Sequence, residues 1–152
     1  SGRMLEHFHE GTLTYRVAGI REKVPVTYVE VSPELASQRN IMAGALVRLI
    51  SPYGTVKLRA VVTDRVQGNE LYLPMNSARD DEAVNYLTSS YVDKATHTPA
   101  YKEVSVRMEV LEPSGDSPMR PGNPRLGHPN PQPGVNVAQK WARDDYAPLA
   151  SK

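Results

Sequence analysis

The sequence predicts a mainly β fold whose short strands wrap into one compact barrel or sandwich. Three observations in residues 28–74 predict it: apolar and polar residues alternate, turn residues separate the apolar runs, and one run is apolar on both faces. Alternation with a period of two indicates a strand with one buried face, whereas a run that is apolar on both faces indicates a strand covered on both sides.

This strand pattern occurs four times in succession. Residues 27–31 alternate along a first strand, and residues 45–50 form a second that is apolar on both faces apart from Arg48. Residues 55–63 alternate along a longer third strand, and residues 71–73 continue the pattern in a fourth. The predicted core combines the apolar faces of these strands with that of a later one: Val29, Val31, Leu46, Leu49, Val56, Leu58, Ala60, Val62, Leu73, Val104, Val106 and Met108.

The residues between the strands predict how they connect. Ser32, Pro33 and Glu34 place a hydroxyl at a helix N-cap, a proline at the first helical position and a carboxylate in the first turn, so residues 33–39 should form a short helix. The sequence Ser-Pro-Tyr-Gly at 51–54 is typical of a tight turn, so the strands before and after it should pair as a hairpin.

Residues 75–98 lose the strand periodicity and should form a long surface excursion, of the kind that is often functional. Its acidic run, residues 80–82, is interpreted as a solvated surface rather than a metal site. Residues 102–112 alternate again and should form the strand that closes the barrel. Residues 113–152 hold eight of the thirteen prolines and are predicted to be an extended tail to a single domain of residues 1–112.

Composition excludes several classes of function. A net charge of +1, from 18 basic and 17 acidic residues, gives no general attraction to nucleic acid or to an anionic membrane surface. Without cysteine the chain forms no disulfide and supplies no thiolate to an iron–sulfur cluster. No apolar run approaches the roughly 20 residues that span a bilayer. We therefore expect a soluble, cytoplasmic protein with neither nucleic acid nor membrane as a partner.

Residues 6–14 combine histidines, threonines and a glycine in a stretch that suits neither a strand nor a helix. In an extended segment His7 and His9 fall on one side, and Gly11 lets the backbone approach a ligand closely. The stretch is either a binding loop or an exposed polar loop, and its composition leaves both open. A zinc site is the weaker interpretation, because His97 and His128 lack motif spacing relative to the first pair.

Residues 2–14, Gly-Arg-Met-Leu-Glu-His-Phe-His-Glu-Gly-Thr-Leu-Thr, resemble the signature of a known family. It is the C-terminal, molybdopterin-dinucleotide-binding domain of the oxidoreductases that carry two molybdopterin guanine dinucleotides (bis-MGD), such as formate dehydrogenases. Asn-Tyr-Leu-Thr at 85–88 and Thr-Pro-Ala-Tyr-Lys at 98–102 resemble later motifs, so that the resemblance covers residues 1–112. Residues 123–141 are similar to the end of bacillus-type cytosolic formate dehydrogenase α-subunits.

The resemblance implies a six-stranded double-psi β-barrel with short helices that covers part of the cofactor. Molybdenum or tungsten, any iron–sulfur cluster and the catalytic residues would belong to other domains of a parent enzyme that oxidises formate to CO2, and these domains would be the partners. In the family a strand precedes the Gly-Arg signature, so the first barrel strand is expected to lie outside this sequence. Glu10 departs from the family, where a small polar residue is common at this place.

The chemistry of these residues suits such a ligand. A Gly-Thr-Leu-Thr loop offers backbone N–H groups and hydroxyls to a pyrophosphate, Arg3 or Lys102 offers a cation, and imidazoles and amides match the donors and acceptors of a pterin edge. The resemblance further implies that residues of the loop (Arg3, His7, His9, Gly11 and Thr12) converge with Asn85 and Lys102 on one face. The implied cofactor-binding residues are Gly2, Arg3, Leu5, Glu6, His7, His9, Gly11, Thr12, Leu13, Thr14, Asn76, Asn85 and Lys102, with no catalytic residue and no metal ligand.

Two other functions are alternatives to this one. Double-psi barrels also serve as stand-alone adaptors that bind partner proteins, and the proline-rich tail would then be a docking arm. A nucleic-acid-binding barrel is disfavoured by the near-neutral charge and by one phenylalanine and one tryptophan, although the eight tyrosines could stack on bases.

Overall fold

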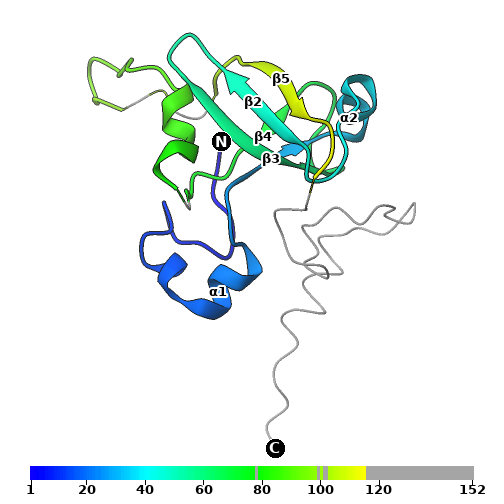
Figure 1. Cartoon of the computed structure of the whole chain (residues 1–152). Coiled ribbons are helices and arrows are strands. Elements are labelled where there is room, and N and C mark those ends of the chain that lie inside the picture. Colours follow the sequence, from blue (N-terminus) through cyan, green and yellow to red (C-terminus); the bar gives the residue numbers. More distant parts are fainter. Residues whose placement is uncertain (78, 99, 101–102, 116–152) are drawn as a thin grey trace, which may run out of the picture.

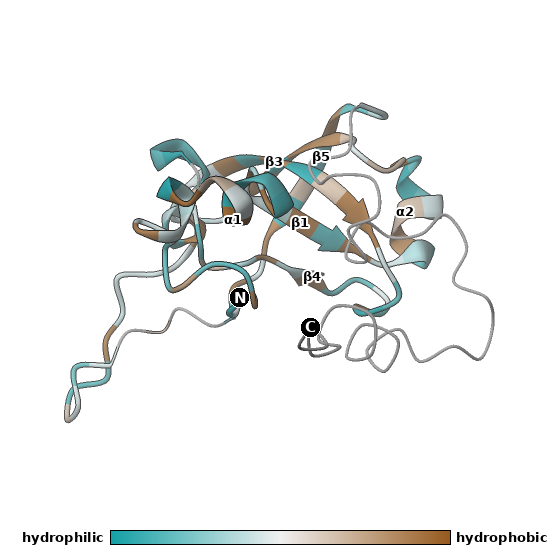
Figure 2. Cartoon of the chain, turned by 90° about the horizontal axis from the view of Figure 1, so that it is seen from below, coloured by the Kyte–Doolittle hydropathy of each residue, from teal (hydrophilic) through white to brown (hydrophobic). Residues whose placement is uncertain are grey.

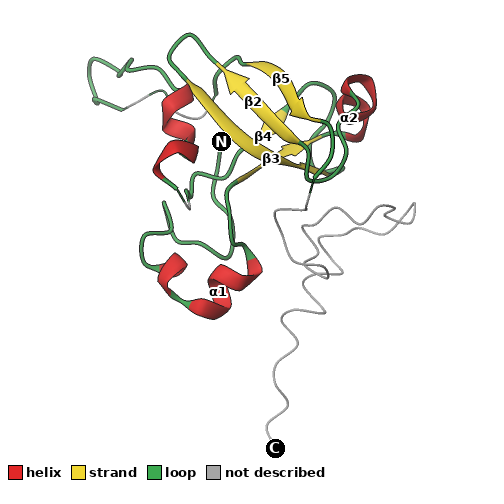
Figure 3. Cartoon of the chain, viewed as in Figure 1, coloured by secondary structure: helices red, strands yellow, loops and turns green. Residues whose placement is uncertain are grey.

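The computed structural model describes residues 1–77, 79–98, 100 and 103–115. Figures 1 and 3 show a sheet with short helices around it. The elements in chain order are η1 (Thr14–Arg16), α1 (Ala18–Lys23), β1 (Tyr28–Val31), α2 (Pro33–Arg39), β2 (Leu46–Ile50), β3 (Thr55–Val62), β4 (Leu71–Tyr72), η2 (Asp80–Glu82), η3 (Val84–Leu87) and β5 (Arg107–Glu112), where η marks a 3-10 helix. The mainly β prediction is confirmed.

The sheet has five strands in the order β4-β1-β3-β2-β5. β1 pairs in parallel with the central strand β3, whereas the other three pairings are antiparallel. Figures 1 and 2 place α1 and α2 at opposite ends of this sheet. No pairing joins the edge strands β4 and β5 in the described part of the chain, so the sheet is open there. The six-stranded double-psi barrel is therefore not confirmed.

The predicted hairpin and helix are confirmed. β2 and β3 pair in antiparallel register around the turn at 51–54, where the Ser51 hydroxyl accepts hydrogen bonds from the backbone N–H groups of Tyr53 and Gly54 (3.1 and 3.2 Å). At α2 the Ser32 hydroxyl accepts from the Leu35 N–H (3.1 Å), which satisfies a donor that the first turn of a helix leaves unpaired. Local turn and cap chemistry was sufficient to predict both elements.

The main core joins residues of β1, β2 and β3 to residues of α2 and η3, and it contains most of the predicted residues. In Figure 2 the hydrophobic colour runs through the strands. The prediction that Leu46 belongs to the core is wrong: Leu46 is only half-buried, whereas its neighbour Val47 is fully buried. Val47 and Leu49 share the face of β2 that points inward. The other face also carries apolar residues, so the sequence alone did not show which face is buried. Val62, Val104, Val106 and Met108 pack against the core and are partly exposed.

A second, smaller core cluster was not predicted. It joins Met4 and Val24 of the N-terminal region to Tyr28 on β1 and Val61 on β3. On the other face of β1 the cluster covers Tyr28, while Glu30 pairs with Arg65. All four residues of β1 are therefore buried, and the predicted half-exposed strand is wrong. The helix α1 within residues 1–24 was likewise not expected.

Two further expectations need correction. The excursion of residues 75–98 is not wholly a surface segment, because η3 inserts Val84 and Leu87 into the main core at 5% and 1% exposure. The last strand, β5, begins at Arg107 rather than at residue 102. β5 lies at the sheet edge and pairs with β2 alone, so it closes no barrel among the residues described.

The expectations for residues 116–152, including the extended tail, lie outside the described residues, as does Lys102. None of the helices formed by the described residues combines the length and the apolar character that crossing a bilayer requires.

Candidate functional site

The candidate site is a pocket of about 170 Å³ formed by the N-terminal segment. Its lining residues are nearly consecutive: Arg3, Met4, Leu5, Glu6, His7, Phe8, His9 and Thr14. The segment that sequence reasoning had singled out as a possible binding loop therefore forms a concave surface. Such a volume is below the range of about 300–1,000 Å³ that is usual for pockets enclosing whole small-molecule ligands. The pocket formed by the described residues is therefore too small to enclose a ligand of that size by itself.

His7 anchors the segment that forms this pocket. Its side chain is 3% exposed, its Nε2 lies 2.9 Å from the carbonyl oxygen of Val24, and its Nδ1 lies 2.8 Å from the Thr14 hydroxyl. Because a carbonyl only accepts, Nε2 must carry a proton and donate to Val24. In the neutral imidazole Nδ1 then accepts from Thr14. Both ring nitrogens are engaged within the chain, so His7 fixes the shape of the segment.

Tyr15 ties the segment to the rest of the fold. Its ring stacks on His7, with ring centroids 3.8 Å apart, and its hydroxyl accepts a 2.6 Å hydrogen bond from the Asn76 amide nitrogen. Burial raises the pKa of the Tyr15 hydroxyl, although the bond to Asn76 opposes the shift, and this keeps the hydroxyl neutral. Gly11, at φ 87°, is required beneath this ring, since a Cβ there would lie 2.5 Å from ring atoms.

Asn76 leaves one polar atom without a partner. Its side chain is fully buried, and its Oδ1 accepts no hydrogen bond from the described residues. A buried acceptor without a partner costs about 1–3 kcal/mol. An atom of this kind fits a donor supplied from outside the chain, such as an amino or ring N–H group.

Contacts with β4 and with the residues just after it position the start of the N-terminal segment. Gly2 makes an isolated parallel bridge to Pro74, and the Tyr72 hydroxyl donates a 2.6 Å hydrogen bond to the Arg3 carbonyl. The guanidinium of Arg65 lies 6.0 Å from the Tyr72 ring centroid and donates to the buried carboxylate of Glu30 (2.9 Å). Because a Cβ on Gly2 would lie 2.9 Å from the Tyr72 hydroxyl, glycine is needed for this close approach.

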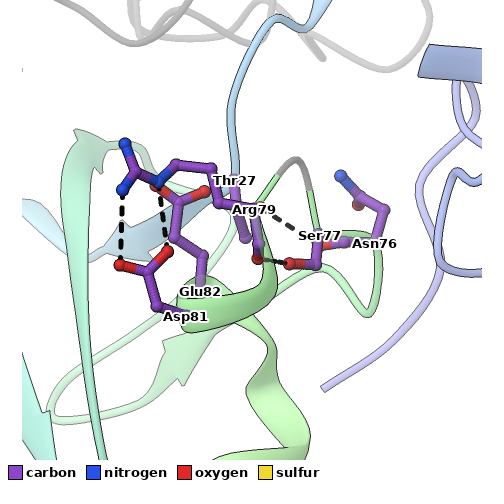
Figure 4. Close-up of polar contacts among 6 residues, drawn as sticks. All are labelled: Thr27, Asn76, Ser77, Arg79, Asp81 and Glu82. Atoms are coloured by element: carbon purple, nitrogen blue, oxygen red, sulfur yellow. Dashed lines mark hydrogen bonds and ion pairs between the residues drawn. The ribbon is translucent and has the colours of Figure 1, made fainter. Parts of the chain in front are cut away.

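The acidic run next to Asn76 forms ion pairs (Figure 4). Arg79 contacts Asp81 (3.1 Å) and Glu82 (3.9 Å), and the Ser77 hydroxyl donates to the Arg79 carbonyl. Burial raises the pKa of the Glu82 carboxyl, and the nearby charge of Arg79 opposes the shift. Asp81 is exposed, as expected for a solvated run, whereas Glu82 is mostly covered. No group of three potential ligand residues converges on a metal position in the described part of the chain.

The remaining predicted residues divide by exposure. Arg3, Leu5, Thr12, Leu13 and Asn85 are exposed, whereas Gly2, Glu6, His9 and Thr14 are half-buried. His9 stands at φ 50°, so it does not share an extended face with His7 as expected. Asn85 lies on η3. The convergence of Asn85 and Lys102 with the loop stays a prediction, because Lys102 lies outside the described residues.

Sequence reasoning missed Tyr15 and Tyr72, which position the segment without belonging to its expected contacts. Asn76 is 61 residues from Tyr15, and Tyr72 is 69 residues from Arg3. No local pattern encodes contacts between residues so far apart. Among the residues that line the pocket, the exposed Arg3 offers a cation and the segment offers backbone groups to a polar ligand.

Comparison with known proteins gives a consistent result. Residues 1–105 match the family model described as "Molydopterin dinucleotide binding domain". The chain is 56% identical over 146 residues to "Probable oxidoreductase YjgC" of Bacillus subtilis, and 54% identical over 149 residues to "Putative formate dehydrogenase YrhE" of the same organism. These matches cover 96% and 98% of this chain but only 15% of each relative.

A solved structure shares the fold. "Acetylene Hydratase from Pelobacter acetylenicus" superposes with a TM-score of 0.57 at 10% identity, over 70% of this chain and 17% of that one. At this identity the likeness concerns the fold alone.

Proposed function

Because the chain belongs to the molydopterin dinucleotide binding domain family, we propose that it binds and covers a molybdopterin guanine dinucleotide within a larger formate-oxidising enzyme. The chain is homologous to oxidoreductases of the formate dehydrogenase type and spans about 15% of the length of the curated relatives it matches. The guanine base, the pairing of two such cofactors, the metal (molybdenum or tungsten) and an iron–sulfur cluster in other domains are the finer parts of the proposal. They rest on the signature at residues 2–14.

The observation that carries this proposal is the pocket formed by the signature residues themselves. Its wall is held rigid by His7, and near it Asn76 buries an acceptor with no partner among the described residues. Arg3 lines the same pocket with an exposed guanidinium, which suits a phosphate or a pterin oxygen. The small volume supports a cofactor held between this chain and a second wall supplied by the rest of the parent protein.

The reaction belongs to the parent protein in this proposal. This chain holds the cofactor and contributes no nucleophile, acid–base pair or metal ligand. The six-stranded double-psi barrel is part of the same proposal and would need a strand added to the five-stranded sheet. The cytoplasmic location is likewise proposed, from the resemblance of residues 123–141 to cytosolic formate dehydrogenases. The family match and the names of the relatives favour this function over a stand-alone adaptor.

The test is Arg3→Ala in the full-length parent protein, with Arg107→Ala as the control. Both side chains are exposed arginines, but Arg107 lies on β5 and pairs with Glu109 at 3.1 Å. A charge-assisted hydrogen bond contributes about 1.5–3 kcal/mol, or about 10- to 150-fold in affinity. We expect the guanine nucleotide released per purified protein to fall for Arg3→Ala alone. Equal content in the two variants would contradict the assignment of Arg3. Lys102→Ala should lower the content in the same way.

A further inference from the structure

The N-terminal segment that lines the pocket, together with the residues that follow it, carries several exposed apolar side chains. Leu5, Phe8, Leu13 and Val17 are 72%, 68%, 69% and 50% exposed. They are four of the ten exposed large hydrophobic residues in the described part of the chain, and they fall within residues 5–17. We call these four side chains the N-terminal apolar surface. Exposed apolar residues concentrated in one segment in this way point to an interaction site.

These four side chains cannot become buried through a local rearrangement of the segment. The inward positions of the segment are already filled by Met4, His7 and Gly11, which are buried. His7 is bonded through both ring nitrogens, and the turn is closed by the hydrogen bond from the Gly11 N–H to the Phe8 carbonyl (2.9 Å). Because the anchors fix the backbone, the apolar residues between them are held outward. Covering them requires a surface from outside the described residues.

We propose that the N-terminal apolar surface is covered by polypeptide from the rest of the parent protein, and that its side chains are interdomain contacts rather than cofactor contacts. The inference rests on the proposed function. The length of the relatives supports this occupant. The matched region is 15% of each relative, so each contains over six times as much chain as that region. Chemistry also supports this occupant, because a pterin dinucleotide is polar and charged, whereas Leu5, Phe8 and Leu13 offer neither donors nor acceptors. Leu5 and Phe8 also line the pocket, so this contact would lie directly beside the cofactor site.

Hydroxyl-radical footprinting of the full-length parent protein, with and without cofactor, tests the inference. The oxidation rate of Phe8 is measured relative to the urea-unfolded protein, with Tyr28, which is fully buried, as the internal standard of protection. Polypeptide coverage predicts that Phe8 is as protected as Tyr28 in both forms. Protection that appears only with cofactor bound would overturn the inference and make Phe8 a cofactor contact. Oxidation near the unfolded rate in both forms would overturn it as well.

A matched pair of variants gives a second readout in the cofactor-free protein. Leu13→Asp places a charge on the covered surface, whereas Met42→Asp changes a residue of similar exposure (64%) that follows α2. Leu13→Asp is expected to speed tryptic cleavage after the exposed Arg16 and Arg21, and Met42→Asp is not. Equal cleavage rates would contradict the inference. Cofactor content is measured separately, with Arg3→Ala. Equal cleavage rates for Leu13→Asp and Met42→Asp would refute the interdomain contact without affecting the proposed function. Equal cofactor content in Arg3→Ala and its control would refute the assignment of Arg3 without affecting the interdomain contact.

Discussion

The packing of the β2–β3 turn against η3 predicts the effect of Gly54→Ala. A Cβ on Gly54 would lie 2.4 Å from the Tyr86 carbonyl oxygen and 3.3 Å from its carbonyl carbon. Non-bonded heavy atoms prefer about 3.5–4.0 Å. The clash is with backbone, so it is relieved only if the turn and η3 separate. Overpacking of this kind costs about 1–3 kcal/mol. Gly54 is not among the residues with positive φ, so the cost comes from contact rather than from backbone strain.

Gly19→Ala is the control for this prediction. Gly19 lies within α1, and a Cβ there would meet nothing within 4 Å. Alanine in a helix is favoured over glycine by up to about 1 kcal/mol, so this variant should be neutral or stabilised. Urea denaturation of the 152-residue chain, followed by far-ultraviolet circular dichroism, measures both variants. The reasoning would be refuted if Gly54→Ala lost no more stability than Gly19→Ala.

Three further outcomes are expected from the same denaturation assay. Leu58→Ala should cost about 2–5 kcal/mol because Leu58 is 1% exposed in the core, whereas Leu46→Ala should cost less, and equal costs would mean that the register of β2 is wrong. Ser32→Ala should cost about 1–3 kcal/mol, because it removes a helix cap and a 2.6 Å hydrogen bond to the Gly68 carbonyl; a wild-type midpoint would contradict this. Burial raises the pKa of Glu82 above its ordinary 4.5, so its protonated form stabilises the fold and that contribution is lost as pH rises through the folded-state pKa. Glu82→Gln should therefore flatten the decline of stability with pH in that window, and an unchanged profile would contradict the shift.

The sequence predicted those parts of the fold that short-range chemistry determines. Ser32 and Pro33 mark the start of α2, and the Ser-Pro-Tyr-Gly turn sets the β2–β3 hairpin, so both could be read within a few residues. The parallel pairing of β1 with β3 and the second core cluster depend on contacts between distant segments. The alternation along β1 predicted one buried face, because no local signal shows that Met4 and Val24 cover the other.

The sequence indicated which segment forms the candidate site, but it did not indicate how the residues of that segment are arranged. Residues 3–9 and Thr14 of the stretch 2–14 line the pocket, yet the roles of its members could not be separated, because buried and exposed residues alternate irregularly around the turn at Gly11. The tyrosines at positions 15 and 72 were missed for a different reason. Their partners, Asn76 and Arg3, lie more than sixty residues away in sequence, where only the folded sheet brings them together.

Burial separates the residues that build this site from those that can meet a ligand. His7 has both ring nitrogens engaged within the chain and is 3% exposed, so its replacement should lower the stability of the fold and cofactor binding together. Arg3 is exposed and its backbone carbonyl, not its side chain, is bonded to Tyr72, so removing its guanidinium should lower binding with little effect on stability. A ratio of binding loss to stability loss therefore distinguishes scaffold from contact within one contiguous motif. If His7→Ala and Arg3→Ala gave the same ratio in the parent protein, the anchoring role that the structure assigns to His7 would be wrong.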